Sequence, residues 1–542
     1  MIPRNPAVAA TPRPNASRLA IGQAVEALRS GDPADAERTL RMHLLADPND
    51  GVALAKLGEI VRDQGKARDA ILLFRRALQA SPTMQAVRIA LARLLQVQGE
   101  PQRALDLIEE LPTEFRSTFD VQTFEAALLG QLGRHEPEIL IYDRLVASRP
   151  EVPSLWNSLG NALKYAGRPD GAVRALRRAV TIRPDYGEGW WSLANMKTVR
   201  FGGRDLATMR KALAARPAPD DSLHLHFALG KALEDRNEYE QSFRHYAKGN
   251  RIRASAFRPE QVRATAFVNC AMAAFDGRLF DKQSASGDPA HDPIFIVGLQ
   301  RSGSTLVEQI LASHPLIEGT SELIVMQQLW SEVARESEAQ GQSIWQDLSR
   351  LPVDRFREIG AAYLERTRQF RRTERAYFID KLPANWMNVG LIRLALPNAK
   401  IVDARRHPLA CGFSNFKQHY ATGVAFAYSL PSIGAFYADY LRLMRHFDRV
   451  QPGAIHHLLN ERLIDDPEGE ARRLLDYVGV PFDPACLEFH RNSRAVATPS
   501  AEQVRRPINR DGVDYWRHYE PWLDELKQSL GGALQEWDSP SP

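Results

Sequence analysis

Two patterns of apolar and polar positions divide the chain. In the first half, small residues recur every 34 positions, and prolines recur at the same interval, as Pro48 and Pro82 or Pro150 and Pro184 do. In the second half, short apolar runs are followed by stretches with apolar residues at helical spacing. The first pattern predicts pairs of helices, because small residues let two helices approach closely and proline ends the second one. The second pattern predicts buried strands that alternate with helices.

Seven repeat units in register extend from residue 17 to residue 254. The small residue that marks each unit is one of Ala24, Gly58, Ala92, Ala126, Gly160, Ala194 and Ala228. This period is typical of tetratricopeptide repeats, which form an all-α solenoid. The unit at 119–152 has Pro137 where its second helix should begin. We expect this unit to fold as a repeat all the same, because proline is tolerated in a first helical turn. Two roles are open for the solenoid: a groove that holds an acceptor or partner, or a scaffold that braces or dimerises the protein.

Four short apolar runs in the second half are predicted strands, at 293–297, 376–379, 400–404 and 455–459. Helices are expected after them, beginning near residue 306, near Pro408 and at Pro467. This alternation predicts a P-loop-like α/β domain with a central parallel sheet over residues 292–535. Residues 255–291 are expected to form a helical connector and a polar linker.

The first predicted strand runs into a loop of small and polar residues. Segment 298–305 contains two glycines, one arginine and three hydroxyl side chains, namely Gly298, Arg301, Ser302, Gly303, Ser304 and Thr305. Such a loop exposes consecutive backbone N–H groups, and the helix that follows adds its positive N-terminal end. Glycine lets the backbone approach oxygen atoms closely, and arginine adds a fixed positive fork. The segment therefore predicts a phosphate-binding site.

This loop departs from the nucleotide-triphosphate loop at one position. The pattern G-x-x-x-x-G-K-[ST] fits Gly298, Gly303 and Thr305, but Ser304 stands where the lysine is required. That lysine reaches the terminal phosphates of a triphosphate. Its absence argues against hydrolysis of ATP or GTP and favours a dianionic ligand without a long triphosphate tail.

The segment VGLQRSGSTLVEQILASHP resembles the phosphosulfate-binding loop of sulfotransferases that use 3′-phosphoadenosine 5′-phosphosulfate (PAPS). The likeness is to tyrosylprotein sulfotransferases and to bacterial proteins that join such a domain to tetratricopeptide repeats, and it extends from Asp292 to Trp522. The usual family loop reads G-x-P-R-S-G-T-T; here Gln300 replaces the proline and Ser304 replaces a threonine. The resemblance implies that residues 301–305 hold the phosphosulfate.

A catalytic set is also implied by the resemblance. Glu322 takes the place of the family's general base, which removes the proton of the acceptor hydroxyl. Read without the family, Thr320 or Ser321 caps a helix and Glu322 only complements its dipole. Lys381, at the carboxyl end of the second predicted strand, matches the lysine that neutralises charge on the leaving oxygen. Ser500 falls on the serine that accompanies this lysine.

Further basic and hydroxyl residues are implied to bind the nucleotide. Arg406 and Ser414 match the arginine and serine that hold the 3′-phosphate, where an arginine gives a bidentate charge-assisted contact. Arg505, with its neighbours Arg506 and Arg510, is expected to cover the nucleotide as a lid, and the sequence does not choose among the three.

Some positions depart from the family pattern. Leu323 and Ile324 follow Glu322, where the tyrosylprotein enzymes have arginines nearby. Asn460 stands where relatives often have a tyrosine that touches the nucleotide. These departures bear on acidic-peptide recognition and on one nucleotide contact.

Composition restricts the partners. The 542 residues carry a net charge of +4 without long runs of like charge, so no nucleic-acid partner is predicted. Cys270, Cys411 and Cys486 form no C-x-x-C pair, and no metal-ligand spacing is visible, so neither a disulfide framework nor a metal is predicted. No apolar run reaches the ~20 residues of a membrane helix. Residues 1–16 are expected to be a disordered lead-in, and the expected setting is a bacterial cytoplasm.

Together these features predict an enzyme that transfers a sulfuryl group from PAPS to a hydroxyl and releases adenosine 3′,5′-bisphosphate. The expected acceptor is a peptide tyrosine held with help from the repeats; a glycan or metabolite hydroxyl is the alternative, and a homodimer is left open. Two rivals are a Mg–ATP phosphoryl-transfer enzyme, in which Asp403 would hold the metal, and a non-catalytic scaffold. The missing loop lysine opposes the first, and the presence of Glu322, Lys381 and Ser500 opposes the second.

Overall fold

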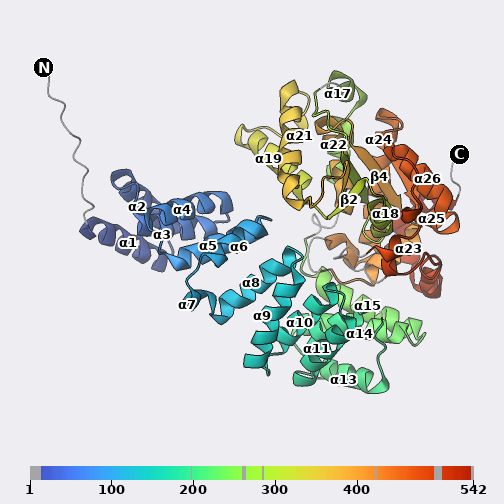
Figure 1. The fold of residues 1–542 in the computed structure, drawn as a ribbon, viewed down its shortest axis with the longest axis horizontal. Coiled ribbons are helices and arrows are strands. Elements are labelled where there is room, and N and C mark those ends of the chain that lie inside the picture. The colour runs from blue at the N-terminus through green and yellow to red at the C-terminus, as the bar shows by residue number, and fades with distance from the viewer. Residues whose placement is uncertain are drawn as a thin grey trace. The chain divides into compact units, whose positions relative to one another are not determined.

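A computed structural model describes residues 14–196, 198–258, 264–283, 286–420, 424–492 and 503–538 (Figure 1). The chain divides into two compact units, Met1–Arg168 and Pro169–Pro542. Residues 1–13 of the expected lead-in lie outside the described part, and the first helix already begins at Pro14.

The first unit is built of paired helices that pack on one another in chain order. Their bounds are α1 Pro14–Arg29, α2 Pro33–Ala46, α3 Gly51–Asp63, α4 Ala67–Ala80, α5 Gln85–Val97, α6 Pro101–Glu109, α7 Thr113–Arg116, α8 Phe119–Gln131, α9 His135–Ser148 and α10 Pro153–Tyr165. The small residues that mark the repeat are buried in this unit; Ala92 and Ala126, for example, are fully inaccessible. The predicted α-solenoid is confirmed, including the unit around Pro137, which lies in the first turn of α9.

A second mark of the repeat lies in the turns between paired helices. Five glycines with φ between 68° and 83° occur there at intervals of 34 residues, namely Gly31, Gly65, Gly99, Gly133 and Gly167. Glycine suits this left-handed backbone because it has no Cβ. The turn geometry therefore repeats as strictly as the packing does.

The second unit begins with helices that continue the repeat pattern and the connector. They are α11 Pro169–Ile182, α12 Gly187–Ala194, α13 Gly203–Ala214, α14 Pro219–Glu234, α15 Tyr239–Ala254, α16 Thr265–Ala274 and α17 Gly277–Lys282. Helices assigned to the repeats, up to Ala254, thus share one compact unit with the α/β domain.

A five-stranded parallel sheet forms the centre of the α/β domain. Its strands are β1 Pro293–Gly298, β2 Ile317–Ser321, β3 Tyr377–Lys381, β4 Lys400–Arg405 and β5 Ile455–Leu459, in the order β2-β3-β1-β4-β5. The four predicted strands are confirmed. β2 is an additional strand, and it contains Thr320 and Ser321, which the sequence indicated as candidate helix caps. An edge strand that pairs on one side needs few apolar residues, and so its sequence does not announce it.

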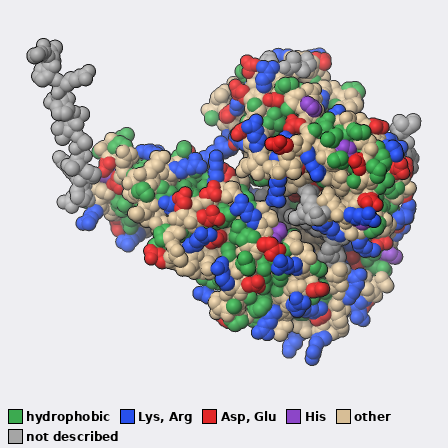
Figure 2. Space-filling view, viewed as in Figure 1, with side chains coloured by type: hydrophobic (Ala, Val, Ile, Leu, Met, Phe, Trp, Pro, Cys, Tyr) green, Lys and Arg blue, Asp and Glu red, His purple; other side chains and the backbone are tan. Residues whose placement is uncertain are grey.

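Helices follow the strands and bury their apolar faces against the sheet. The main ones are α18 Ser304–Ala312, α19 Val325–Ala339, α21 Val353–Thr367, α22 Val389–Ala395, α23 Pro408–Phe416, α24 Leu430–Val450, α25 Asn460–Asp465, α26 Pro467–Val478 and α27 Asp524–Leu530. One core cluster joins Ile296 of β1, Ile310 of α18, Val402 of β4 and Leu474 of α26. On the face seen in Figure 2, basic and acidic side chains are interspersed, as the balanced sequence predicts.

Candidate active site

The carboxyl ends of all five strands bring the candidate residues to one edge of the sheet. The loop after β1 contains Arg301, Glu322 follows β2, and Lys381 ends β3. Arg406 follows β4, and Asn460 follows β5. Because all the strands are parallel, residues that are distant in sequence meet there, and ligands of open α/β sheets bind at this edge.

The loop after β1 has an unusual backbone. Gly298, Arg301 and Gly303 have φ angles of 133°, 70° and 99°. A left-handed arginine is strained, and such residues cluster at binding sites where the surrounding structure holds them. A Cβ at Gly303 would lie 2.5 Å from Oδ1 of Asn460, so a larger residue here would have to displace that side chain as well as adopt a left-handed backbone. The loop therefore forms a concave turn of N–H groups that suits an anion.

The three hydroxyl residues of this loop are buried, namely Ser302, Ser304 and Thr305. Ser302 is 2% exposed, and its Oγ has no hydrogen-bond partner in the described part of the chain. Ser304 and Thr305 begin α18, where the first N–H groups have no intrahelical partner. A buried hydroxyl without a partner costs free energy unless a ligand supplies one. The loop residues thus fit a group rich in oxygen acceptors.

Two arginines and a serine lie together beside this loop. Arg301 Nε donates to Ser414 Oγ at 3.0 Å, which joins the loop to α23. Arg406 donates to the backbone oxygen of Arg301 at 3.3 Å and to that of Gly512, while its Nε has no partner within the described residues. Burial lowers the pKa of Arg406. The structure therefore brings together the three residues expected around the phosphates.

Glu322 and Lys381 form a direct ion pair at the same edge. Lys381 Nζ contacts Glu322 Oε1 and lies 3.9 Å from Oε2 of Glu308, a buried carboxylate on α18. The side chains of Lys381 and Glu308 are 2% and 3% exposed, whereas that of Glu322 is 49% exposed. A buried lysine beside a half-exposed carboxylate can donate toward developing negative charge while the carboxylate accepts a proton from outside.

Asp380, next to Lys381, is a buried carboxyl that the sequence did not single out. It accepts hydrogen bonds from Tyr363 OH at 2.8 Å and from the backbone N–H of Leu323 at 3.3 Å. Burial raises the pKa of Asp380 to about 7. Since Leu323 follows Glu322, this carboxyl helps to hold the segment that carries the candidate base.

The arginines expected to cover the nucleotide from the closing segment contact other parts of the chain. Ser500 lies outside the described residues. Arg505 is exposed and donates to the backbone oxygen of Asn492, and Arg510 pairs with Asp465. The expectation that one of these arginines covers a nucleotide stays a prediction.

Several residues at the site were missed from sequence. Asn415 Nδ2 donates to the backbone oxygen of Gln300 at 2.7 Å and so supports the loop from α23. Tyr420 OH donates to Asn415 Oδ1 at 2.7 Å, and Glu308 approaches Lys381. The one available signal was the charge of Glu308 within a helix of mostly uncharged, buried residues, because a buried charge needs a partner.

Asp403, which a metal-dependent phosphoryl transfer would require, is engaged inside the domain. Arg405 Nε donates to it at 2.6 Å, His457 Nδ1 lies 2.9 Å away, and Tyr440 OH also donates to it. Burial acts to raise the pKa of Asp403, but Arg405 and His457 outweigh this effect and hold it at about 2. This carboxylate therefore orients Arg405 instead of facing the loop.

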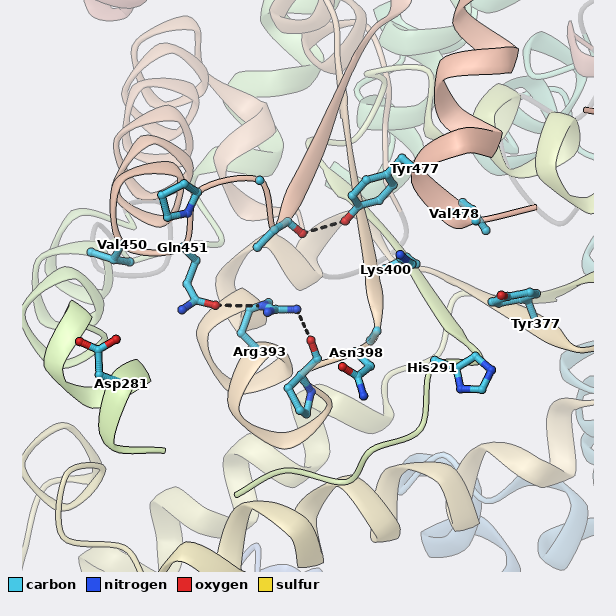
Figure 3. Close-up of a pocket in the computed structure, with 16 residues that line it drawn as sticks. Asp281, His291, Tyr377, Arg393, Asn398, Lys400, Val450, Gln451, Tyr477 and Val478 are labelled. Atoms are coloured by element: carbon cyan, nitrogen blue, oxygen red, sulfur yellow. Dashed lines mark hydrogen bonds between the residues drawn. The ribbon is translucent and has the colours of Figure 1, made fainter. Parts of the chain in front are cut away.

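A cavity of about 860 Å³ lies at the opposite, amino edge of the sheet (Figure 3). Its lining includes His291 just before β1 and Lys400 at the start of β4. Arg393 donates there to the backbone oxygen of Pro397 and to Gln451 Oε1. The helices α22, α24 and α26 end at this edge, so these basic groups complement exposed carbonyls and negative helix ends. The cavity is thus separate from the candidate site.

Comparison with known proteins agrees with the fold. A model described as "Sulfotransferase family" matches residues 293–484, and tetratricopeptide-repeat models match residues 21–84, 61–128 and 153–196. The α/β domain is therefore a sulfotransferase-family domain, and the chain joins it to tetratricopeptide repeats, as the sequence predicted. A transferase is the class of protein that this combination supports.

Individual relatives match only parts of the chain. An uncharacterized protein of Aquifex aeolicus is 30% identical over 320 residues, which cover 58% of this chain and 42% of that protein. The human protein O-mannosyl-transferase TMTC1 is 22% identical over 151 residues, or 27% of this chain and 17% of its own length. The chain thus spans about two fifths, or less, of these relatives.

Among solved structures, the sulfotransferase domain of the Synechococcus PCC 7002 olefin synthase has a TM-score of 0.35 and 21% identity, covering 48% of this chain and 98% of its own. The MamA protein has a TM-score of 0.29 and 22% identity, covering 32% of this chain and 96% of its own. Among the described residues, no helix is long and apolar enough to cross a membrane.

Proposed function

We propose that this protein catalyses the transfer of a sulfuryl group from PAPS to a hydroxyl group. The observation that carries the proposal is the Glu322–Lys381 ion pair. It lies at the same sheet edge as a loop with a left-handed arginine and a buried Ser302 hydroxyl that has no hydrogen-bond partner among the described residues. Such a site has a proton acceptor, a cation for developing charge and an anion cradle. PAPS would supply the activated sulfuryl group.

The loop residues have the task of binding and orientation. Backbone N–H groups of 301–305 and the hydroxyls of Ser302, Ser304 and Thr305 would hold the 5′-phosphosulfate. Arg406 and Ser414 would hold the 3′-phosphate; each hydrogen bond to a charged group contributes roughly 1.5–3 kcal/mol. In this arrangement Arg301, which contacts Ser414 in the structure, lies between the two anionic ends of the nucleotide.

The proton and charge movements fall to Glu322 and Lys381. Glu322 would leave its ion pair and take the proton of the acceptor hydroxyl at a carboxylate oxygen. The hydroxyl oxygen would thereby become more nucleophilic as it attacks sulfur. Lys381 would then direct its ammonium group to the bridging oxygen of the departing bisphosphate, and Glu308 remains as its buried counter-charge. Ser500 would assist Lys381. No metal is assigned a role, and Asp403 is committed to Arg405.

For the acceptor, we propose a tyrosine on a peptide, because half-exposed Glu322 can meet an approaching chain and the repeats provide a protein-binding surface. A glycan or metabolite hydroxyl is the alternative. The setting we propose is the bacterial cytoplasm. Incubation with radiolabelled PAPS and separate peptide, glycan and metabolite pools, followed by a mass-spectrometric search for an 80-dalton gain, distinguishes them.

Nucleotide binding provides the direct test of the reaction class. Adenosine 3′,5′-bisphosphate at 100 times its dissociation constant should raise the unfolding free energy by about 2.7 kcal/mol. Mg–ATP should produce no comparable shift, because the loop lacks the triphosphate lysine. Stabilisation by Mg–ATP without stabilisation by the bisphosphate would overturn the proposal in favour of phosphoryl transfer.

A further inference from the structure

The last helix pair of the repeats, α14 and α15, contacts the end of the helix that carries Ser414 (Figure 1). All of these elements belong to the second compact unit. The contacts are polar, buried and specific, and they reach the two residues that end α23, Phe416 and Lys417.

One contact is made by Glu234, the last residue of α14, which is buried. Its Oε1 accepts a hydrogen bond from Lys417 Nζ at 3.0 Å. Its Oε2 accepts from Tyr246 OH and from Tyr519 OH, each at 3.2 Å. Burial lowers the pKa of Lys417, and Glu234 opposes this effect. A buried carboxylate that pairs with a partly buried lysine holds both side chains, because separating them leaves a buried charge without compensation.

A second contact comes from Asn250 on α15. Its Nδ2 donates to the backbone oxygen of Phe416 at 2.7 Å, and the residue is 1% exposed. Phe243, on the same helix, stacks on the Phe416 ring with centroids 5.5 Å apart. The terminal carbonyl of α23 thus has a partner from the repeats, as a buried helix end requires.

The preceding two residues of α23 contact the phosphosulfate loop. Ser414 Oγ accepts from Arg301 Nε at 3.0 Å, and Asn415 Nδ2 donates to the Gln300 oxygen at 2.7 Å. Four consecutive residues therefore connect the loop with the repeats. Residues 414 and 415 contact the loop, and residues 416 and 417 contact the repeats. A rotation or shift of this helix end would move both sets of contacts together.

We propose that Glu234 and Asn250 are positioning residues for the nucleotide site, so that the final repeat fixes α23 and thereby the strained conformation of the loop. This inference rests on the proposed function. Neither residue contacts the reacting groups. Their loss should therefore raise the KM for PAPS and the Kd for adenosine 3′,5′-bisphosphate and leave kcat at saturating PAPS unchanged.

The experiment compares Glu234→Gln and Asn250→Leu with Tyr246→Phe in the full-length protein. Tyr246→Phe is a matched control, because it removes a hydrogen bond from the same carboxylate but only within the helix pair. Calorimetric titration with adenosine 3′,5′-bisphosphate should show about tenfold weaker binding for the first two variants, the size expected when a buried hydrogen bond is broken. The control should stay within about twofold of wild type.

A rescue variant separates positioning from general damage to the fold. Glu234→Gln combined with Lys417→Met leaves no unpaired charge but still lacks the bond between α14 and the end of α23, so it should recover stability while bisphosphate binding stays weak. Recovered affinity would assign the loss to the unpaired charge and overturn the positioning role of Glu234. Circular dichroism identifies any variant that fails to fold, and Asn250→Leu keeps the test open if Glu234→Gln does not fold.

The outcomes separate the two proposals. If wild-type protein does not bind the bisphosphate, the proposed function fails. If wild-type protein binds the bisphosphate and both single variants bind it as tightly as wild type does, the positioning role is overturned. The same holds if the single variants lower kcat without raising the KM for PAPS.

Discussion

The anion loop and the Glu322–Lys381 pair occupy one edge of the sheet but are held in different ways. The loop is held through its backbone: Asn415 donates a hydrogen bond to the Gln300 oxygen, Arg406 donates one to the Arg301 oxygen, and Gly303 has a left-handed conformation that favours glycine. The pair depends on one contact between side chains, and Glu322 is half exposed. Binding groups are thus preorganised, whereas the groups that move protons must separate before they act.

The largest effect is expected where the mobile pair is broken. Glu322→Gln should lower turnover by about 10²–10⁴, the usual contribution of a general base, and should leave bisphosphate binding unchanged. A radiolabelled transfer assay and a titration measure the two quantities. Glu338→Gln, on the exposed side of α19, is the control. Unchanged turnover in Glu322→Gln would remove this residue from the mechanism.

Loss of the other partner should be nearly as severe. Lys381→Met keeps the length of the side chain but removes its charge, and turnover should fall by about 10²–10³, as for removal of one donor to a developing oxyanion. Single-turnover kinetics at saturating PAPS measure the chemical step. If Lys381→Met only raised the KM for PAPS, Lys381 would serve in binding. The anion loop and the Glu322–Lys381 pair would then have the same role.

The preorganisation of the loop is tested by adding one methyl group at residue 303. Gly303→Ala forces a left-handed alanine against Asn460, and strain of roughly 1–3 kcal/mol corresponds to about ten- to hundredfold weaker bisphosphate binding. Gly341→Ala is the matched control, since Gly341 has φ of 73° but open space around the added atom. It should cost some stability and leave binding as in wild type. Equal affinity in Gly303→Ala would contradict a preorganised loop.

A smaller effect is expected at the junction of the loop and α23. Ser414→Ala removes the acceptor of the Arg301 bond and one candidate phosphate donor, so binding should weaken about fivefold, or by about 1 kcal/mol. Titration calorimetry measures it, with Ser331→Ala on the surface of α19 as control. A larger loss in the control than in Ser414→Ala would speak against the assignment.

The smallest effect on activity is expected at Asp380, where the quantity that changes is stability as a function of pH. Asp380 has its pKa raised to about 7 by burial, against about 3.9 in an unfolded chain. Between these values the folded state holds more protons than the unfolded state, so this group's contribution to stability falls as pH rises from about 4 to 7. The melting temperature of wild type minus that of Asp380→Asn should decline over this range and level off above it. A flat difference would show that Asp380 stays charged.

Local signals in the sequence were sufficient to predict much of this molecule. The 34-residue period fixed the helix pairs, because each small residue is a packing requirement that recurs at one place in every unit. The strand before Gly298 and the glycines of the loop predicted an anion site, and the missing lysine argued against hydrolysis of ATP or GTP there. These features depend on neighbouring residues, and so they can be read along the chain.

Tertiary structure alone decided which distant residues meet. Edge pairing made β2 a strand although its residues are mostly polar, and the parallel sheet then brought Glu322 to Lys381. Buried Glu308 lies near Lys381, and burial raises the pKa of Asp380. Both follow because a charge removed from water needs a counter-charge or a proton. The bond from Asn250 to the end of α23 was equally invisible in the sequence, since a contact across 166 residues leaves no local pattern.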